Sequence, residues 1–319
     1  MKTEEFQLDT GGAVFGEVVA RPPRNIITVA TFRRPFHTRL CLEATARAQR
    51  WSGRWANLIA VCVPCNAHEH PDVAVEIQGV IDRNPDVPFV IWHEDCPSDP
   101  HAASKWMLDK AFAAGAEIAL YVEDDAVLAV DALLMCEFVK RMTDKEHPAY
   151  GFYGLYGPYG TAGMKGDVLG CCLYHETIPA QYIAEGRIDG PDARLLHLSN
   201  GLNTCGGTAF LRQPYLDYLS PNWNCKQVEP RGFDYSAHYL MYLHGLYMVW
   251  PDLSRSFNIG FTSGSISQSE WAKYFGRSIW TQTKDAARVW YDFRMDGIVP
   301  ATVREPWMGT ELLHRGLLP

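Results

Sequence analysis

Three consecutive acidic residues, Glu123, Asp124 and Asp125, follow an apolar run that begins at Ala116. A second apolar stretch comes directly after them, so the acids are predicted to lie at the end of a buried strand. Carboxylates this close repel one another unless a cation lies among them. Their oxygens suit Mn²⁺ or Mg²⁺, which also bind nucleotide phosphates. The triplet predicts a metal site for a nucleoside diphosphate; the alternative is a surface cluster at a helix N-terminus, where the helix dipole favours acids.

Four cationic residues lie where they could meet the same ligand. Arg33 and Arg34 follow the first predicted strand and are expected at the same edge of the sheet as the triplet. Arginine there can clamp phosphate oxygens, or it can simply cap a turn in solvent. Lys105 and His101, at the start of the helix before the triplet strand, are weaker candidates for the same role.

Asp234 is the candidate general base. It lies between Phe233 and Tyr235 at the start of a predicted apolar helix. A carboxylate among aromatic rings can be partly desolvated, which tunes it to accept a proton from a hydroxyl group. An ordinary helix N-cap is the alternative, and Asp189 and Asp192 in a predicted loop are rival bases.

A cluster of sulfur and imidazole side chains begins inside the second predicted strand, at Cys62, and continues with Cys65, His68 and His70. These ligand types can hold zinc, but the short spacing favours a loop with buried thiols. No Gly-x-Ser-x-Gly elbow, phosphate-binding Gly-rich loop or dinucleotide fingerprint is present, which disfavours those enzyme classes.

The elements that must position these residues alternate between strand and helix over residues 25–140. This alternation predicts an α/β fold with a mostly parallel central sheet flanked by helices, and ligands bind such sheets at the carboxyl ends of the strands. The predicted strands are 25–30, 57–63 and 87–93, and the predicted helices are 36–50, 73–83 and 101–114. Later segments predict a strand and a flexible loop over 150–170, a loop leading into a helix over 200–219, a helix over 233–247 and a strand over 248–251.

The composition excludes several classes. The 319 residues are 47% hydrophobic and 21% charged, which is typical of a soluble globular protein. A net charge of −8 without a Lys/Arg cluster disfavours a nucleic-acid acceptor without excluding it. Neither a secretory signal nor an apolar run of membrane-spanning length is found, and nine scattered cysteines fit a reduced, cytoplasmic setting.

At this point the residues resemble a known family. Thr31 to Arg34 after the first strand, then Lys105-Trp106, then Tyr121 to Asp125, are similar to nucleotide-sugar glycosyltransferases of the GT-A fold, and more narrowly to the Golgi-type β-1,2-N-acetylglucosaminyltransferases. The segment from Trp250 to Gly260 echoes a later motif of that family. The membrane anchor of the Golgi enzymes is missing, so the resemblance implies neither location nor acceptor.

The resemblance implies roles for individual residues. Asp125 would ligate a Mn²⁺ (or Mg²⁺) that bridges the donor diphosphate, with Glu123 and Asp124 supporting the ribose and the metal shell. Asp234 lies in the interval of the family's catalytic base, although the family's acidic pair is here reduced to one aspartate.

The implied function is inverting transfer of a hexosyl or N-acetylhexosaminyl group from a nucleotide sugar to a hydroxyl of a glycan, protein or other acceptor. The alternatives are a sugar-phosphate nucleotidyltransferase and a non-catalytic nucleotide-sugar or glycan-binding module. The expected organisation is a leader (1–24), a nucleotide-sugar-binding half (25–145), an acceptor and catalytic half of the same domain (146–270) and a C-terminal extension (271–319).

Overall fold

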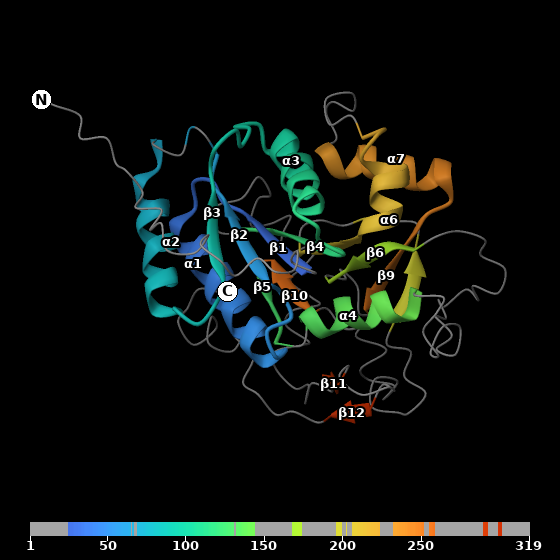
Figure 1. Cartoon of the computed structure of the whole chain (residues 1–319), viewed down its shortest axis with the longest axis horizontal. Helices are drawn as coiled ribbons and strands as arrows, with labels where there is room; N and C mark the ends of the chain where they lie inside the picture. The colour runs from blue at the N-terminus through green and yellow to red at the C-terminus, as the bar shows by residue number, and fades with distance from the viewer. Residues whose placement is uncertain are drawn as a thin grey trace, which may run out of the picture.

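The structure is a computed structural model, and it gives the chain the α/β architecture drawn in Figure 1. The expected leader (1–24) and most of the expected C-terminal extension lie outside the described residues, so the proposed division of the chain stays a prediction. The described residues are 25–64, 66, 69–130, 132–143, 168–173, 196–199, 202, 206–223, 232–251, 255–258, 290–292 and 299–301.

A central sheet of eight strands carries the fold, in the order β3-β2-β1-β4-β8-β6-β9-β7. The first four of these pair in parallel. β8 is antiparallel to β4 and to β6, and β9 is parallel to β6 and antiparallel to β7. Six of the eight strands therefore run in one direction, as the sequence predicted. The strands are β1 (Asn25–Ala30), β2 (Leu58–Cys62), β3 (Phe89–Trp92), β4 (Ile118–Glu123), β6 (Val168–Cys172), β7 (Leu196–Ser199), β8 (Thr208–Leu211) and β9 (Tyr247–Pro251).

Three helices connect the parallel strands, and each begins with a proline. Proline is favoured in the first helical turn because its fixed φ suits the helix and its missing N–H leaves no donor unsatisfied. The helices are α1 (Pro35–Trp51), α2 (Pro71–Arg83) and α3 (Pro100–Ala113). Asp99 also caps α3, because its carboxylate accepts a hydrogen bond of 2.8 Å from the backbone N–H of His101.

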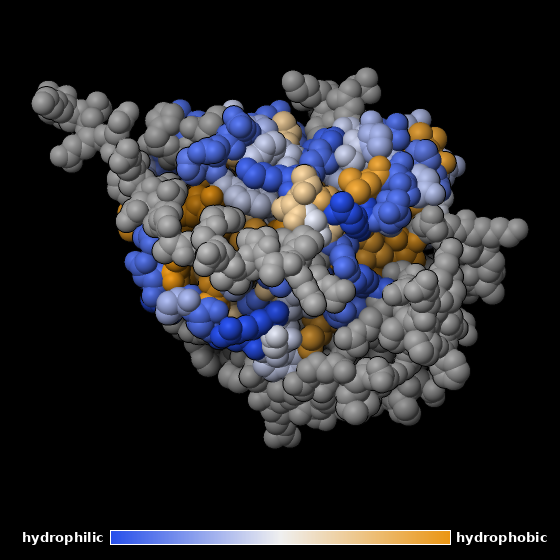
Figure 2. Space-filling model, viewed as in Figure 1, coloured by the Kyte–Doolittle hydropathy of each residue, from blue (hydrophilic) through white to orange (hydrophobic). Residues whose placement is uncertain are grey.

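Helices cover both faces of the sheet (Figure 1). Successive strand residues point to opposite faces, so Ile27 and Val29 pack in the core with α1, α2 and α4 (Ala132–Thr143), whereas Ile26 packs in the core with α3 and α7 (Gly232–His244). Burying an isoleucine side chain stabilises the fold by about 1.5–3 kcal/mol. On the side shown in Figure 2, hydrophilic residues cover much of the described surface and apolar ones show mainly between them. The predicted fold class is confirmed.

The region 200–219 differs from its prediction as a loop leading into a helix. Thr208–Leu211 instead forms β8, a strand in the middle of the sheet, and short helical turns α6 (Arg212–Pro214) and η2 (Tyr215–Leu219) follow it. The strand has only four residues and follows Gly206-Gly207, so its local sequence is typical of a loop; pairing with β4 and β6 makes it a strand.

β6 and β8 approach each other too closely for a side chain at Gly170. A Cβ atom there would lie 1.9 Å from the carbonyl oxygen of Ala209. Cys171 and Cys172, on the same strand, are buried and pack within the two cores on either side of the sheet. Two short pairs lie outside the main sheet: β5 (Ala126–Leu128) with β10 (Ser256–Asn258), and β11 (Trp290–Asp292) with β12 (Val299–Ala301).

Within the ranges given above, no helix combines the length and the apolar character needed to cross a membrane.

Candidate acidic site at the carboxyl edge of the sheet

The ends of β1 and β4 lie side by side, and this brings the candidate residues together. The two strands are parallel neighbours, and their last residues, Ala30 and Glu123, are paired. The chain leaves β1 through Thr31 toward Arg34, which stands directly before α1, and it leaves β4 through a turn at Asp124 and Asp125. The predicted placement of the acids at a strand end is therefore confirmed.

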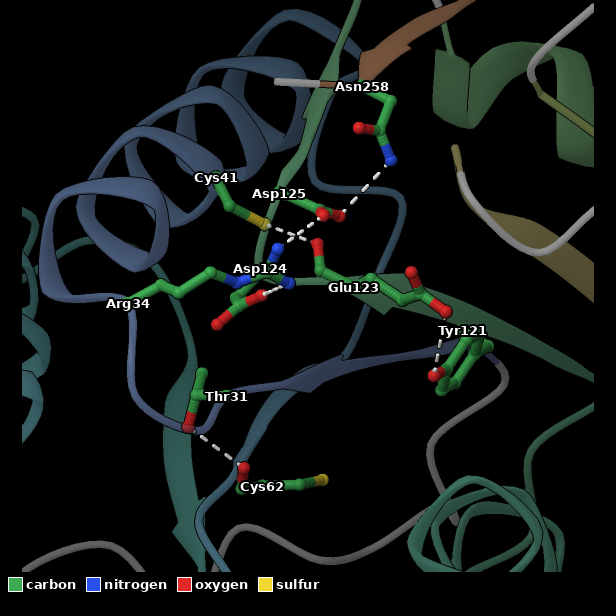
Figure 3. Close-up of polar contacts among 9 residues, drawn as sticks. All are labelled: Thr31, Arg34, Cys41, Cys62, Tyr121, Glu123, Asp124, Asp125 and Asn258. Carbon is green, nitrogen blue, oxygen red and sulfur yellow. Dashed lines mark hydrogen bonds and ion pairs between the residues drawn. The ribbon is translucent and has the colours of Figure 1, made fainter. Parts of the chain in front are cut away.

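Arg34 bridges the two aspartates (Figure 3). Its Nη1 lies 2.6 Å from Asp125 Oδ2, and its Nη2 donates a hydrogen bond to Asp124 Oδ1. The Asp124 and Asp125 side chains are only 4% and 8% exposed, whereas that of Arg34 is 20% exposed. One guanidinium thus holds two nearly buried carboxylates, in the charge-assisted geometry that arginine favours.

Asn258 reaches the same pair from a distant part of the chain. β10 pairs with β5 so that Asn258 lies opposite Ala126, next to Asp125. Its Nδ2 donates a hydrogen bond of 3.3 Å to Asp125 Oδ1 (Figure 3). The sequence had not identified Asn258, but its segment, Trp250 to Gly260, carried part of the family resemblance. The structure places the β10 part of that segment, Ser256–Asn258, beside the acids.

The four carboxylate oxygens of the aspartate pair are not equally satisfied. Asp125 has a donor on each oxygen, from Arg34 and Asn258, and Asp124 Oδ1 has one from Arg34. Within the described part of the chain, Asp124 Oδ2 is buried and accepts no hydrogen bond of good geometry, although the nearby backbone N–H of Phe32 favours the ionised form of this carboxyl group. Leaving a buried acceptor unsatisfied is costly, so this oxygen has capacity for a proton or a cation.

The cluster also carries unbalanced charge. Two ionised carboxylates and one guanidinium sum to −1, from −2 and +1. Burial and the neighbouring Asp125 charge raise the pKa of Asp124 from 3.8 to about 6, although Arg34 opposes this shift. Burial alone would lower the pKa of Arg34, but the two carboxylates outweigh it and raise the pKa. Arg34 therefore stays charged, while the pair would accept further positive charge.

Glu123 points away from the aspartate pair (Figure 3). Its carboxylate oxygen Oε1 lies 3.4 Å from the Tyr121 hydroxyl group, which in turn accepts a hydrogen bond of 3.0 Å from Ser104. Burial, followed by the Glu123 charge, raises the pKa of Tyr121 well above its usual range. The predicted triplet therefore divides into an aspartate pair and a separate Glu123–Tyr121 contact.

Cys41 of α1 lies against the backbone of the triplet. Its thiol donates a hydrogen bond of 3.4 Å to the Glu123 carbonyl oxygen. Complete burial and the charges of Asp124 and Asp125 raise the pKa of this thiol well above its usual range. It is therefore a neutral donor that fixes the turn and not a nucleophile.

Arg33 and Lys105 are not joined to the aspartate pair. Arg33 is exposed, and its guanidinium lies 5.7 Å from the centre of the Phe32 ring. Lys105 forms an ion pair with Asp109, one turn further along α3. Their predicted contact with a donor stays a prediction.

The backbone of Asp234 lies in the first turn of α7, as predicted, and its side chain is outside the described residues. Its role as a base is untested.

The possible zinc cluster lies partly outside the described residues, which omit Cys65 and His68. Cys62 ends β2 and is buried, and His70 packs its ring edge to face against Phe32 at 5.3 Å. In the described ranges, no three His, Cys, Asp or Glu side chains converge as a metal cage.

A divalent cation nevertheless fits the aspartate pair if a ligand completes its coordination. The donors are carboxylate oxygens, which suit Mg²⁺ and Mn²⁺, and Asp124 Oδ2 is an unsatisfied acceptor among them. Mg²⁺ is commonly held by one or two carboxylates together with substrate phosphates, without a cage made only of protein. The residues therefore fit a site that is completed by a phosphate ligand.

Comparisons with known proteins give distant structural similarity only. The sequence matches no protein-family model and no curated protein sequence. Among solved structures, it is similar to the mannosyltransferase PcManGT from Pyrobaculum calidifontis in complex with GDP-Man and Mn²⁺, with 13% identity and a TM-score of 0.37. That match covers 64% of this chain and 50% of the other, so the chain spans half the length of that protein. It is also similar to S. aureus TarS 1-349, with 9% identity, a TM-score of 0.39 and coverage of 81% and 71%.

Proposed function

We propose that this protein is a metal-dependent glycosyltransferase that moves a sugar from a nucleoside-diphosphate sugar to an acceptor hydroxyl group. The observation that carries the proposal is the buried Arg34–Asp124–Asp125 cluster at the carboxyl edge of the parallel strands, where α/β folds bind their ligands. Its net negative charge and its unsatisfied acceptor favour a cation. β10, which ends in Asn258 and lies within the Trp250–Gly260 segment, is beside this cluster, so residues from two separate parts of the family resemblance meet there.

Each residue of the cluster has a proposed role. Asp125 and Asp124 hold Mn²⁺ or Mg²⁺, and Asn258 orients the Asp125 carboxylate. When bound, the cation supplies Lewis-acid neutralisation of the departing diphosphate. Arg34 is near enough to the same edge to contribute positive charge to the phosphates.

The acceptor side of the reaction rests on Asp234. In the proposed inverting reaction, Asp234 takes the proton from the acceptor hydroxyl group as that oxygen attacks the anomeric carbon. Its place in the first turn of an apolar helix supports this role. Loss of such a base is expected to cost on the order of 10²–10⁴ in rate.

The donor sugar, the cellular location and the roles of the remaining candidate residues are also proposals. They include the likeness to the Golgi-type N-acetylglucosaminyltransferases, a hexosyl or N-acetylhexosaminyl donor, and roles for Arg33, Lys105 and Glu123 near the nucleotide. A cytoplasmic location is supported by the six described cysteines, which are all free thiols.

The test is a donor screen with wild type and Asp125→Ala. We expect nucleotide sugars to raise the melting temperature of wild type only when Mn²⁺ is present, because a ligand selective for the native state stabilises it. Asp125→Ala should show no such shift in melting temperature. Its rate of metal-dependent donor consumption should fall by more than about 100-fold, because mutating residues that only support metal ligands already lowers metal affinity or activity by about 10–100-fold. Asp86→Ala is the matched control, because Asp86 also pairs with an arginine but is exposed.

Three outcomes would contradict the proposal. If Asp125→Ala consumed the donor at the wild-type rate in the presence of a chelator, the reaction would need no metal at Asp125. Donor binding without consumption across a panel of glycan, protein and small hydroxyl acceptors would favour a binding module. Release of pyrophosphate from a nucleoside triphosphate and a sugar 1-phosphate, supplied in place of the nucleotide sugar, would favour a nucleotidyltransferase.

A further inference from the structure

Arg34 occupies the position from which a cation would approach Asp125. One oxygen of Asp125 accepts from Arg34 at 2.6 Å and the other accepts from Asn258 at 3.3 Å. Asp124 gives one oxygen to Arg34 and keeps one buried. Arg34 is thus the shared partner of both carboxylates, and a metal cannot take Asp125 Oδ2 while the guanidinium stays on it.

We propose that Arg34 is a built-in counter-cation of the resting site, which competes with the metal and moves from the aspartates to the donor diphosphate when the donor and the metal bind together. This inference rests on the proposed function and adds the order in which the metal and the donor bind. Metal alone should bind weakly, because it must displace Arg34. Metal with a diphosphate should bind well, because the displaced guanidinium gains a new anionic partner.

Charge supports this exchange. With Arg34 in place the cluster sums to −1, and adding a divalent cation would give +1 with two cations sharing the same carboxylates. Once Arg34 has left, the two carboxylates and the divalent cation sum to zero. A diphosphate supplies the additional anionic oxygens that both cations need, and arginine binds such oxygens in a bidentate manner.

The position of Arg34 also allows the exchange. Arg34 is the residue directly before α1, and its side chain is 20% exposed, several-fold more than that of Asp124. The guanidinium is therefore more accessible to a ligand from solvent than either carboxylate. Arg33, its neighbour, is exposed and lies over the Phe32 ring. Arg33 carries the same charge one residue away but does not bridge the two aspartates, so it is a matched control for the binding of Mn²⁺ alone.

The experiment measures the affinity for Mn²⁺ by the electron paramagnetic resonance signal of free Mn²⁺. The proteins are wild type, Arg34→Gln, Arg34→Lys and Arg33→Gln, each alone and with uridine or guanosine diphosphate. Arg34→Gln should bind Mn²⁺ alone roughly 5- to 150-fold more tightly than wild type, the usual range of a coupling between two ligands. For Mn²⁺ without the diphosphate, Arg33→Gln should match wild type, because Arg33 does not contact the aspartates. The diphosphate should raise the Mn²⁺ affinity of wild type more than that of Arg34→Gln.

Arg34→Lys separates displacement from simple charge repulsion. Lysine keeps the positive charge but is a point charge without the planar fork that bridges two carboxylates. Displacement predicts an Mn²⁺ affinity between those of wild type and Arg34→Gln. Equal affinity for Arg34→Lys and wild type would show that only charge matters and would overturn the proposal, as would an unchanged or weaker affinity in Arg34→Gln.

The same variants also show whether the loss of Arg34 acts only by unfolding the protein. If Arg34→Gln is unfolded without metal, titration with Mn²⁺ should refold it, because the cation replaces the missing guanidinium; failure to refold, with Arg34→Lys binding as wild type does, would overturn the inference. If wild type consumes the donor only with metal while Arg34→Gln binds Mn²⁺ with unaltered affinity, that result would contradict this inference and leave the proposed function intact. Absence of Mn²⁺ binding and of donor consumption in wild type would sink both.

Discussion

Helix α1 has an arginine–aspartate contact at each end, and the two contacts differ in almost every respect. Arg34, before its first residue, holds two aspartates whose side chains are 4% and 8% exposed. Arg50, in its last turn, meets Asp86 through two hydrogen bonds, and both side chains are more than 40% exposed. Arg50 pairs with a single carboxylate through Nε and Nη2, whereas Arg34 divides Nη1 and Nη2 between two carboxylates, so the contacts differ both in the number of acids and in burial.

The two environments shift the aspartate pKa in opposite directions. At Asp86 the hydrogen bonds from Arg50 lower the pKa from 3.8 to about 2. At Asp124 burial and a second carboxylate raise it to about 6 despite the arginine. An exposed pair is therefore complete in itself, whereas the buried cluster still favours a proton or a cation. This incomplete compensation is what makes the Arg34 end a candidate site.

The largest difference should appear when each arginine is removed. Arg34→Met is expected to lower the free energy of unfolding by about 3–5 kcal/mol, because it leaves two buried carboxylates without their partner. Urea unfolding in chelator measures the effect, with Arg33→Met as the exposed control. If Arg34→Met is as stable as Arg33→Met, the cluster is more hydrated than its burial implies and the comparison fails.

The sign of the pH dependence should also separate the two ends. The pKa of Asp124 is raised on folding, so the folded state binds more protons between pH 3.8 and 6, and the contribution of Asp124 to stability falls as pH rises through that window. Asp124→Asn removes this term, on the order of 1 kcal/mol per pH unit. Its stability relative to wild type should therefore rise from pH 4 to pH 6, measured by urea unfolding in chelator. A flat difference would show that the pKa of Asp124 is not raised.

The sequence was sufficient to predict the buried end. An apolar run followed by three acids identifies a strand end, and parallel strands bring their carboxyl ends to one edge, so the Arg33–Arg34 pair and the aspartates could be placed at the same edge without a structure. Which of the two arginines contacts the aspartates could not be predicted. The direction of the Glu123 side chain could not be predicted in this way. Neighbouring residues at the end of a strand point to opposite sides, and which one faces a partner depends on Tyr121 and Ser104.

Long-range pairing accounts for what the sequence did not predict. β8 and β10 are strands of four and three residues, too short to show a period, and each is defined by its partner strand. Asn258 contacts an acid 133 positions away only because β10 pairs with β5. The family resemblance was the only sequence signal that connected these segments.

Asn258 offers a smaller test of the buried end. Asn258→Ala removes a hydrogen bond to a charged acceptor, which typically contributes about 1.5–3 kcal/mol, and the 3.3 Å distance places it at the low end. Chemical denaturation should show this loss, and the Mn²⁺ affinity should fall by about 10–100-fold because Asp125 loses its orienting partner. Asn222→Ala is the control, since Asn222 is exposed and its amide bonds to a backbone oxygen within its own turn. If Asn258→Ala bound Mn²⁺ as tightly as wild type, Asn258 would have no role in orienting Asp125 for the metal.

The smallest effect is expected at the exposed end of α1. Arg50→Gln should leave the melting temperature at pH 7 almost unchanged, because exposed ion pairs are screened by water and salt. The pKa of Asp86 is lowered on folding, so its contribution is present above pH 3.8 and is lost as pH falls toward 2, opposite in sign to that of Asp124. Thermal melts of wild type and Arg50→Gln at pH 7, 3 and 2, in low salt and in 1 M salt, should show a small difference at pH 7 in low salt that shrinks at pH 3, disappears toward pH 2 and is reduced in 1 M salt. A loss at pH 7 as large as that of Arg34→Met would mean that burial does not separate the two ends, and the reason for assigning chemistry to one of them would disappear.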